Sequence, residues 1–212
     1  MEELIDQLIR EGYLKTSLII EAFRRVKRED FVPEDLKGEA DINAPLPIGY
    51  GQTISQPLTV AFMLELLQPK PGDRILDIGS GSGWQTALLA YCVQPTGKVF
   101  AIERISELAE FGKRNVTKYN FIEKGVAEFI WGDGSKKATF DPIRDEISNG
   151  VNKIIAAASA QKVPQYWKEQ LKIGGRIVAP IKESIWLFVK ISEDKFEEQE
   201  FPGFAFVPLI KD

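Results

Sequence analysis

RILDIGSGSGW, residues 74–84, is a short apolar run that ends in a turn with glycine at positions 79, 81 and 83. Glycine lets the backbone turn tightly and lets a ligand approach the main chain closely. The residues that follow, WQTALLAYCV at 84–93, have the character of a helix. A strand, a glycine-rich turn and a helix in this order are typical of the first unit of a nucleotide-binding α/β sheet.

Downstream of this unit, strand-like and helix-like segments alternate. Such alternation implies right-handed βαβ units and a mostly parallel sheet. No helix separates the last two strands, so they are predicted to form an antiparallel hairpin at one edge, with residues 192–200 as its solvated tip. The fold class is therefore α/β, a doubly wound and mostly parallel seven-stranded sheet of the Rossmann-like type. The predicted strands are 74–79, 98–103, 126–131, 152–158, 176–181, 184–191 and 204–210, and the helices between them are 84–93, 106–120 and 164–172.

The N-terminal part of the chain differs from this core. Residues 1–37 show apolar positions at helical spacing, and the proline- and glycine-rich stretch 38–57 forbids a long helix. A further helix is predicted over 58–67. We therefore expect a single domain over 1–212, with N-terminal helices and an active-site loop in 1–57 and the α/β core in 58–212. The basic residues Arg24, Arg25, Lys27 and Arg28, interspersed with acidic ones, are interpreted as a solvated helix face.

Composition excludes several kinds of chemistry. The 212 residues contain no histidine, which removes Ser-His-Asp and Cys-His nucleophile systems and histidine metal ligation. A single cysteine, Cys92, allows neither an internal disulfide nor a thiolate zinc cluster, so no metal site is predicted. With 27 basic and 31 acidic residues, the net charge of −4 argues against a nucleic-acid partner. Neither a signal peptide nor a membrane span is recognisable, so a cytoplasmic protein is expected. A monomer is expected as well.

Three candidate ligand elements stand on successive strand ends. The first is the glycine turn, and the second is Glu103, twenty residues after Gly83, which could accept hydrogen bonds from ribose hydroxyls. The third is WGDG at 131–134, where Asp133 could receive the amino group of adenine, while Trp131 is expected to fill the core. Because the carboxyl ends of strands in an open α/β sheet bind ligands, these elements predict a nucleoside site.

The glycine spacing favours S-adenosylmethionine over NAD. Trp84 stands where the dinucleotide fingerprint needs its third glycine, and Asp77 would repel a diphosphate but could accept from an ammonium group. DIGSGSG at 77–83 also resembles the first motif of Rossmann-like AdoMet-dependent methyltransferases. The predicted cofactor-binding residues are Asp77, Gly79, Ser80, Gly81, Ser82, Gly83, Glu103, Arg104, Gly132, Asp133 and Gly134.

PLPIGYGQTISQP at 45–57 closely resembles the signature of protein-L-isoaspartate O-methyltransferases. The resemblance is collinear over residues 5–209 and includes AIER, GDG, LKIGGR and FVPL. It implies a methyltransferase that transfers a methyl group from S-adenosylmethionine to the free α-carboxylate of isoaspartyl residues in damaged proteins and peptides, which starts repair through a succinimide. It also implies that Ser55 is the active-site residue, with its hydroxyl oriented at the substrate carboxylate, and that Thr53, two residues before it, is the second catalytic residue.

Alternatives remain at this stage. Thr53 and Ser55 could instead cap the helix that begins near Pro57. The chain could methylate another acceptor, or could be a catalytically weak AdoMet-binding interaction module; an NAD-dependent oxidoreductase fits least well. Departures from the family pattern bear on the substrate side of the site: they are Asp41, Asn43, Asn152, Ala157 and a longer segment at 135–150.

Overall fold

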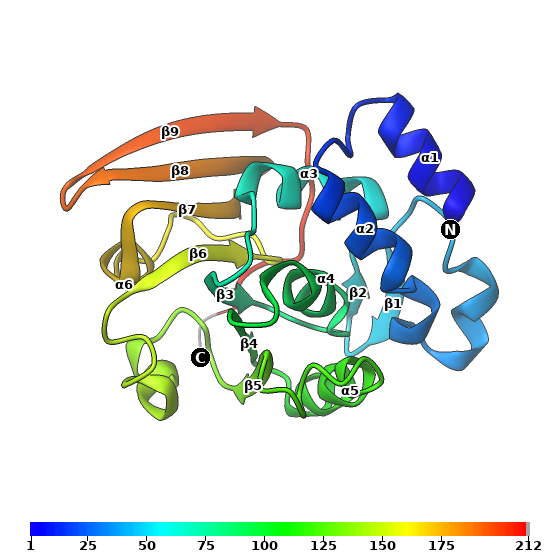
Figure 1. Ribbon diagram of the computed structural model, residues 1–212, viewed down its shortest axis with the longest axis horizontal. Coiled ribbons are helices and arrows are strands. Elements are labelled where there is room, and N and C mark those ends of the chain that lie inside the picture. The colour runs from blue at the N-terminus through cyan, green and yellow to red at the C-terminus, as the bar shows by residue number, and fades with distance from the viewer. Residues whose placement is uncertain (211–212) are drawn as a thin grey trace.

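The computed structural model describes residues 1–210 and shows a central sheet with helices on both faces (Figure 1). Its strand order is β5-β4-β3-β6-β7-β8-β9, in which the first five are parallel and β8 and β9 are antiparallel to their neighbours. The chain therefore runs outward from β3 to β5 and then returns to place β6 on the other side of β3. This confirms the predicted fold class. The strands are β3 (Arg74–Ile78), β4 (Lys98–Glu103), β5 (Ala127–Trp131), β6 (Val151–Ala156), β7 (Leu171–Ile181), β8 (Ser184–Ser192) and β9 (Lys195–Pro202).

Two hydrophobic clusters, one on each face of the sheet, hold the layers together. Successive residues of a strand point to opposite faces, so Ile75 packs in one cluster and Leu76 in the other. Helices α1 to α5 cover the first face, whereas α6 and the segment 137–147 cover the second. The helices are α1 (Glu2–Arg10), α2 (Ser17–Arg25), α3 (Pro57–Leu67), α4 (Trp84–Val93), α5 (Ser106–Thr117) and α6 (Gln165–Gln170), with 3-10 turns η1 (Arg28–Phe31), η2 (Glu34–Glu39) and η3 (Lys137–Ile143).

The C-terminal part differs from the prediction. The charged run at 192–200 is not a hairpin tip: residues 193–194 make the turn, and β9 begins at Lys195. An edge strand tolerates charged side chains because it is exposed to water, and charges there discourage further strand pairing. The segment 204–210 is not a strand either, and Pro208 forms only an isolated bridge with Ser159. Proline cannot donate to a strand ladder.

Two further segments fold in ways that the sequence did not indicate. The stretch 38–57 contains a small antiparallel hairpin, β1 (Leu46–Gly49) and β2 (Gln52–Ile54). The longer segment at 135–150 forms η3 and turns, and its Phe140, Ile143 and Ile147 are buried against the sheet. This segment therefore supplies part of the hydrophobic core on the second face.

Helix α5 packs directly on the glycine turn. A Cβ atom at Gly112 would lie 2.7 Å from the carbonyl oxygen of Gly81, and one at Gly83 would lie 2.8 Å from that of Gly112. Gly83 also has a φ of +85°, in the left-handed region that glycine tolerates. The close approach of α4 and α5 therefore depends on glycine at both positions.

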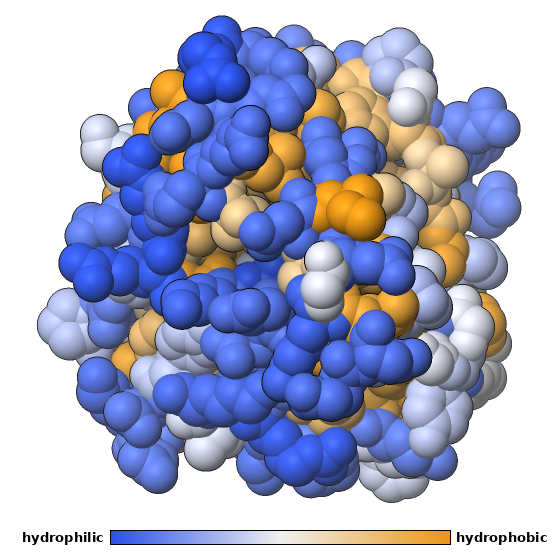
Figure 2. Space-filling model, turned by 90° about the vertical axis from the view of Figure 1, so that its right-hand side faces the viewer, coloured by the Kyte–Doolittle hydropathy of each residue, from blue (hydrophilic) through white to orange (hydrophobic). Residues whose placement is uncertain are grey.

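The surface beside the N-terminal helices is mostly polar, with apolar side chains in separate patches (Figure 2). Arg24, Arg25 and Lys27 are exposed, as predicted, but Arg28 is fully buried. The prediction of a solvated face was wrong for Arg28 because α2 ends at Arg25, and the chain then turns inward. Among the helices within residues 1–210, none is long and apolar enough to cross a membrane.

Candidate active site

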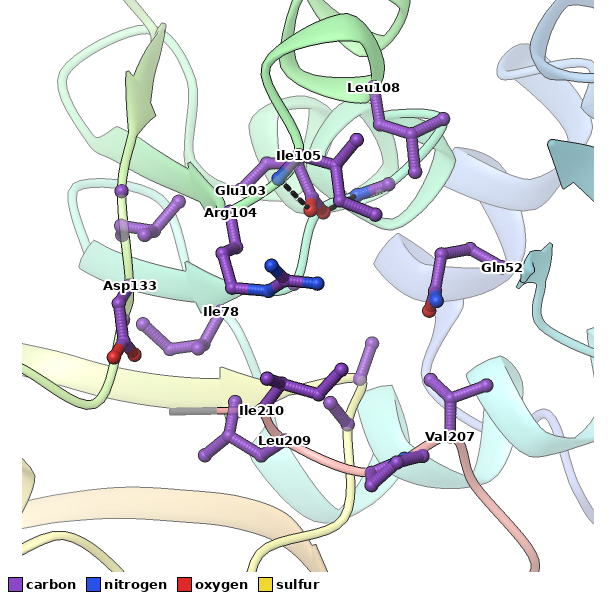
Figure 3. A pocket seen from close by; sticks show the side chains of 18 of the residues that line it. Gln52, Ile78, Glu103, Arg104, Ile105, Leu108, Asp133, Val207, Leu209 and Ile210 are labelled. Atoms are coloured by element: carbon purple, nitrogen blue, oxygen red, sulfur yellow. Dashed lines mark hydrogen bonds between the residues drawn. The ribbon is translucent and has the colours of Figure 1, made fainter. Parts of the chain in front are cut away.

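A cavity of about 660 Å³, counted to its open mouth, lies at the carboxyl ends of β3, β4, β5 and β6. The point where the strand order reverses is the usual ligand site of an open α/β sheet. Side chains from the strand ends, the hairpin and the C-terminal segment surround it (Figure 3). Predicted site residues in its wall are Thr53, Gly79, Gly81, Glu103, Arg104, Gly132, Asp133 and Gly134.

Glu103 is held rigidly at the end of β4. Its Oε2 accepts a hydrogen bond of 2.9 Å from the amide of Gly81, and its Oε1 accepts one of 2.9 Å from the amide of Ile105. The side chain is almost completely buried, and both bonds are drawn in Figure 3. An ionised carboxylate has about four lone-pair sites, so two remain for a ligand. Glu103 therefore joins the glycine turn to β4 and keeps acceptors for a pair of hydroxyl groups.

A second, smaller cavity of about 330 Å³, also counted to its open mouth, adjoins the glycine turn. Ser55 lines this cavity, together with Ser80, Ser82 and Gln85. The Ser80 hydroxyl is buried and has no hydrogen-bond partner in the described structure, so it is available to a bound polar group. Both cavities have four wall residues in common, which makes them neighbouring compartments of one site: Thr53, Gly79, Gly81 and Ala157.

Helix α3 is capped by a residue other than Thr53 or Ser55. The helix begins at Pro57, and the amide of Leu58 donates a 3.1 Å hydrogen bond to Oδ1 of Asn43. Gln56 Nε2 donates a hydrogen bond of 3.0 Å to the carbonyl oxygen of Asn43, which connects Asn43 to the start of the helix a second time. Asn43, one of the departures from the family pattern, therefore supplies the cap.

Asp77 lies behind the glycine turn and lines neither cavity. It is completely buried at the end of β3, where it accepts hydrogen bonds from Gln85 Nε2 at 2.7 Å and from Thr86 Oγ1 at 2.6 Å. Burial raises the pKa of this carboxyl to about 6, although the two hydrogen bonds oppose the shift. In this structure Asp77 connects β3 to the first turn of α4 and holds Gln85 in the smaller cavity.

The end of β5 contributes Gly132, Asp133 and Gly134 to the main cavity. Asp133 is buried, and its Oδ1 accepts a 2.8 Å bond from the amide of Ser135. A Cβ atom at Gly134 would lie 2.6 Å from Cγ2 of Ile78, so glycine is needed for this close approach to β3. Trp131 does not fill the core as expected: it is 71% exposed.

Arg104 belongs to the main cavity, whereas Asn152 and Asp41, two residues that differ from the family pattern, lie outside both cavities. The side chain of Arg104 extends into the main cavity in Figure 3, and its carbonyl oxygen accepts 2.9 Å from Trp131 Nε1. Asn152 is distant from both cavities, where its Oδ1 accepts 2.9 Å from the amide of Arg74. Asp41 is exposed and pairs with the amino terminus of Met1.

The structure brings all but two of the predicted residues to one of the two cavities. The exceptions are Asp77, which is buried, and Gly83, which packs against α5. Sequence reasoning missed the wall formed by residues 207–210, because this segment was interpreted as a strand. Pro208 was the available signal against a strand. Ile48 and Gln52 of the hairpin were also missed, although they lie within the quoted PLPIGYGQTISQP stretch.

The residues fit S-adenosylmethionine. Glu103 offers acceptors suited to the two ribose hydroxyls, and Asp133 offers a carboxylate near the opposite wall. The buried Ser80 hydroxyl, which has no hydrogen-bond partner within residues 1–210, supplies a further polar group in the cavity that Ser55 also lines.

Comparison with known proteins agrees with this geometry. The sequence model of the protein-L-isoaspartate(D-aspartate) O-methyltransferase family matches residues 1–212. A protein-L-isoaspartate O-methyltransferase of Methanopyrus kandleri is 39% identical, and the alignment covers 99% of this chain and 90% of that protein. One of Aeropyrum pernix is 42% identical over 98% of this chain and 78% of that protein. A crystal structure from Plasmodium falciparum, assigned to the same activity and in complex with S-adenosyl-L-homocysteine, has a TM-score of 0.86 at 24% identity, over 99% of this chain and 98% of that one, which supports the fold.

Proposed function

The chain belongs to the protein-L-isoaspartate(D-aspartate) O-methyltransferase family, and on this premise we propose how its two cavities divide the reaction. The enzyme transfers a methyl group from S-adenosylmethionine to the free α-carboxylate of an L-isoaspartyl residue. The main cavity, with Glu103, holds the nucleoside, and the smaller cavity, with Ser55, receives the substrate carboxylate. The observation that carries this assignment is the wall that the two cavities share.

The chemistry requires no imidazole. A carboxylate with an ordinary pKa of about 4 is already ionised at neutral pH and is a nucleophile without a general base. S-adenosylmethionine supplies a methyl group that is activated by its positive sulfur. What the protein must add is orientation of the two reactants, which can contribute several kcal/mol to catalysis. A chain without histidine can therefore perform this reaction.

Individual residues have separate tasks in this proposal. Glu103 accepts hydrogen bonds from the ribose, and Asp133 accepts one from the adenine edge. The Ser55 hydroxyl donates to the substrate carboxylate and keeps one oxygen directed toward the methyl group, with Thr53 beside it at the boundary of the cavities. The support for these roles is the position of each residue in the wall of its cavity.

The cellular setting is also a proposal. We expect the enzyme to act as a monomer in the cytoplasm, on peptides and proteins and not on nucleic acid. Its net charge of −4 supports the last point, because phosphate binding needs clustered basic residues.

The direct test is methyl transfer to matched peptides. The protein is incubated with methyl-labelled S-adenosylmethionine and with two peptides that differ only in having isoaspartate or aspartate at one position. We expect label on the isoaspartyl peptide alone. Equal labelling of both peptides would indicate another carboxyl methyltransferase. Cofactor binding without labelling of either peptide would indicate a binding module and contradict the proposal.

A further inference from the structure

Arg28 is buried beside the active-site loop although it is a charged residue. It begins η1, and its side chain is fully buried. Within the part of the chain that the structure describes, its guanidinium donates to backbone carbonyl oxygens of the 40–55 stretch. Nη1 donates to Ala40 at 3.0 Å and to Ile42 at 3.1 Å. Nη2 donates to Ala44 at 2.8 Å, to Ser55 at 3.1 Å and, more weakly, to Ile54 at 3.5 Å. One side chain thus connects both ends of the loop that contains the hairpin.

This arrangement is energetically costly. Burial lowers the pKa of Arg28 to about 10, and the carboxylate of Asp41 compensates only in part. The Nε atom of Arg28 is buried and has no hydrogen-bond partner among residues 1–210. Apolar residues of similar volume often replace buried charges without loss of stability. A role in stability alone is therefore a poor explanation for a cation at this position.

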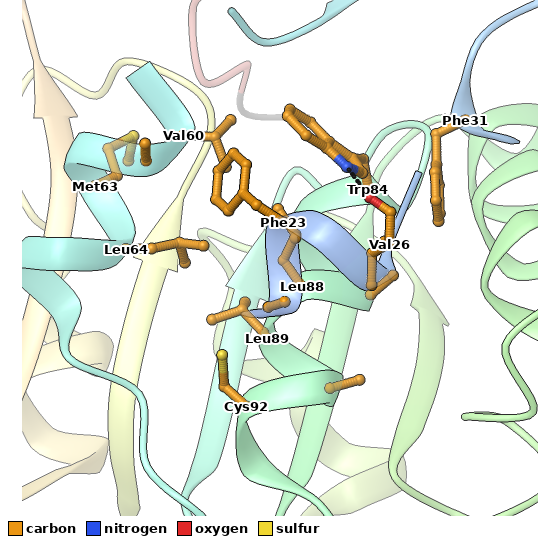
Figure 4. Close-up of a cluster of buried hydrophobic side chains, with 14 of the residues drawn as sticks. Phe23, Val26, Phe31, Val60, Met63, Leu64, Trp84, Leu88, Leu89 and Cys92 are labelled. Atoms are coloured by element: carbon orange, nitrogen blue, oxygen red, sulfur yellow. Dashed lines mark hydrogen bonds between the residues drawn. The ribbon is translucent and has the colours of Figure 1, made fainter. Parts of the chain in front are cut away.

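The same guanidinium contacts two walls of the smaller cavity. One is the backbone of Ser55, through the 3.1 Å bond to its carbonyl oxygen. The other is Trp84, whose ring centre lies 5.4 Å from the Arg28 guanidinium carbon. Trp84 is further fixed by its Nε1, which donates 3.4 Å to the carbonyl oxygen of Val26, and by the edge of Phe23 (Figure 4). Arg28 therefore donates a hydrogen bond to the backbone of Ser55 and makes a cation–π contact with the indole of Trp84.

We propose that Arg28 is a positioning residue of the reaction: it fixes the Ser55 backbone against Trp84, so that the Ser55 hydroxyl is held where the substrate carboxylate must sit. This inference rests on the proposed function and extends it to a residue that does not line either cavity. Arginine suits the task because its planar fork donates in several fixed directions. A lysine ammonium has three donors at one point and cannot hold five carbonyls that lie apart.

The primary test is Arg28→Lys, which keeps the charge and removes the fork. We expect kcat on the isoaspartyl peptide to fall at least 10-fold, while the Kd for S-adenosylhomocysteine, measured by calorimetry, changes less than about 3-fold. Hydrogen exchange should become faster in residues 40–56 and stay unchanged in β3 and β4. Arg25→Lys, on the exposed end of α2, is the matched control and should leave kcat, Kd and exchange unchanged.

A second variant keeps the proposal falsifiable if the lysine disturbs folding. In Arg28→Ala, millimolar guanidinium should restore part of the lost kcat, and urea at the same concentration should not, because urea has the same shape without the charge. A kcat within 2-fold of wild type in both variants would overturn the proposal. Faster exchange throughout the sheet would also overturn it, since Arg28 would then stabilise the whole fold.

Failure of the proposed function would be recognised separately. If the wild-type protein does not label the isoaspartyl peptide, that function is wrong, and the exchange and binding measurements still decide whether Arg28 holds the loop.

Discussion

The nucleoside side and the Ser55 side of the site are built in opposite ways. Glu103, Gly132 and Gly134 stand at or just beyond the ends of strands in a parallel sheet, so the backbone ladder places them. Ser55 follows a three-residue strand in a loop that packs beside the sheet, and a side chain from η1 holds its backbone. The first side is positioned by regular structure, and the second by one buried cation. Changes near the strand ends should therefore affect binding, and changes around the loop should affect turnover.

We expect the largest effect, a loss of cofactor affinity, from a substitution in the nucleoside cavity. Glu103→Ala removes a carboxylate that accepts from two backbone amides and that we assign to the ribose hydroxyls. Hydrogen bonds to charged groups contribute about 1.5–3 kcal/mol each, so the Kd for S-adenosylhomocysteine should rise at least about 100-fold. Calorimetric titration measures it, with Glu107→Ala, at an exposed position on α5, as the control. A Kd within about 3-fold of wild type would remove Glu103 from the cofactor site.

Substitutions in the cavity that Ser55 lines should lower kcat and leave cofactor affinity unchanged. Ser55→Ala removes the hydroxyl that we assign to the substrate carboxylate, and misplacement of a reactant can cost about 100-fold in rate. We expect kcat to fall about 30- to 100-fold, with the Kd for S-adenosylhomocysteine nearly unchanged. Thr53→Val provides a comparison at the boundary of the two cavities and should have a smaller effect. Unchanged turnover in Ser55→Ala would contradict the role given to Ser55.

Asp77 offers a test that depends on pH. Its pKa in the folded protein is about 6, against an ordinary 3.8, so the folded state binds the proton more tightly than the unfolded state. The free energy of unfolding should therefore fall as pH rises from about 4 to about 6 and level off above, by about 2–3 kcal/mol in total. The free energy of unfolding, measured by urea denaturation at each pH, should no longer fall in Asp77→Asn. In the control Asp35→Asn, at an exposed position, it should fall as in the wild type. An Asp77→Asn protein with the wild-type pH dependence would contradict the assignment.

We expect the smallest effect, on the free energy of unfolding, from substitutions of Asn43. Asn43→Ala removes the Oδ1 acceptor of the Leu58 amide, and loss of a helix cap costs about 1 kcal/mol. Asn43→Asp keeps the acceptor and should retain nearly the wild-type free energy of unfolding. Equal loss of stability in both variants would show that the side-chain oxygen does not act as a cap.

The two sides also differ in how far the sequence predicts them. The parallel strands, the glycine turn, Glu103 and Gly132–Gly134 follow local patterns, in which a strand ends at a polar or glycine residue, and they lie where the sequence predicts them. The predictions for Trp131 and for the last strand were wrong. Arg28 could not be assigned, because its charged neighbours are solvated and its partners lie 12 to 27 residues later in the chain. The wall at 207–210 was missed for a related reason. Residues 204–210 are apolar throughout, and Pro208 is the one feature of this segment that argues against pairing in a sheet.

The cavity wall formed by residues 207–210 also affects the order in which the parts of the molecule fold. Val207 and Leu209 pair through their backbones with Ser159, and they face a cavity to which Gln52 contributes from the hairpin. Gln52 and Val207 line the same cavity although 155 positions separate them, and such long-range packing forms slowly because the entropy of closing so large a loop must be overcome first. The nucleoside cavity should therefore be among the last features to form during folding. Because a ligand that binds only the native state stabilises it, the cofactor should slow unfolding and protect against proteolysis only after the chain has folded through the 207–210 segment.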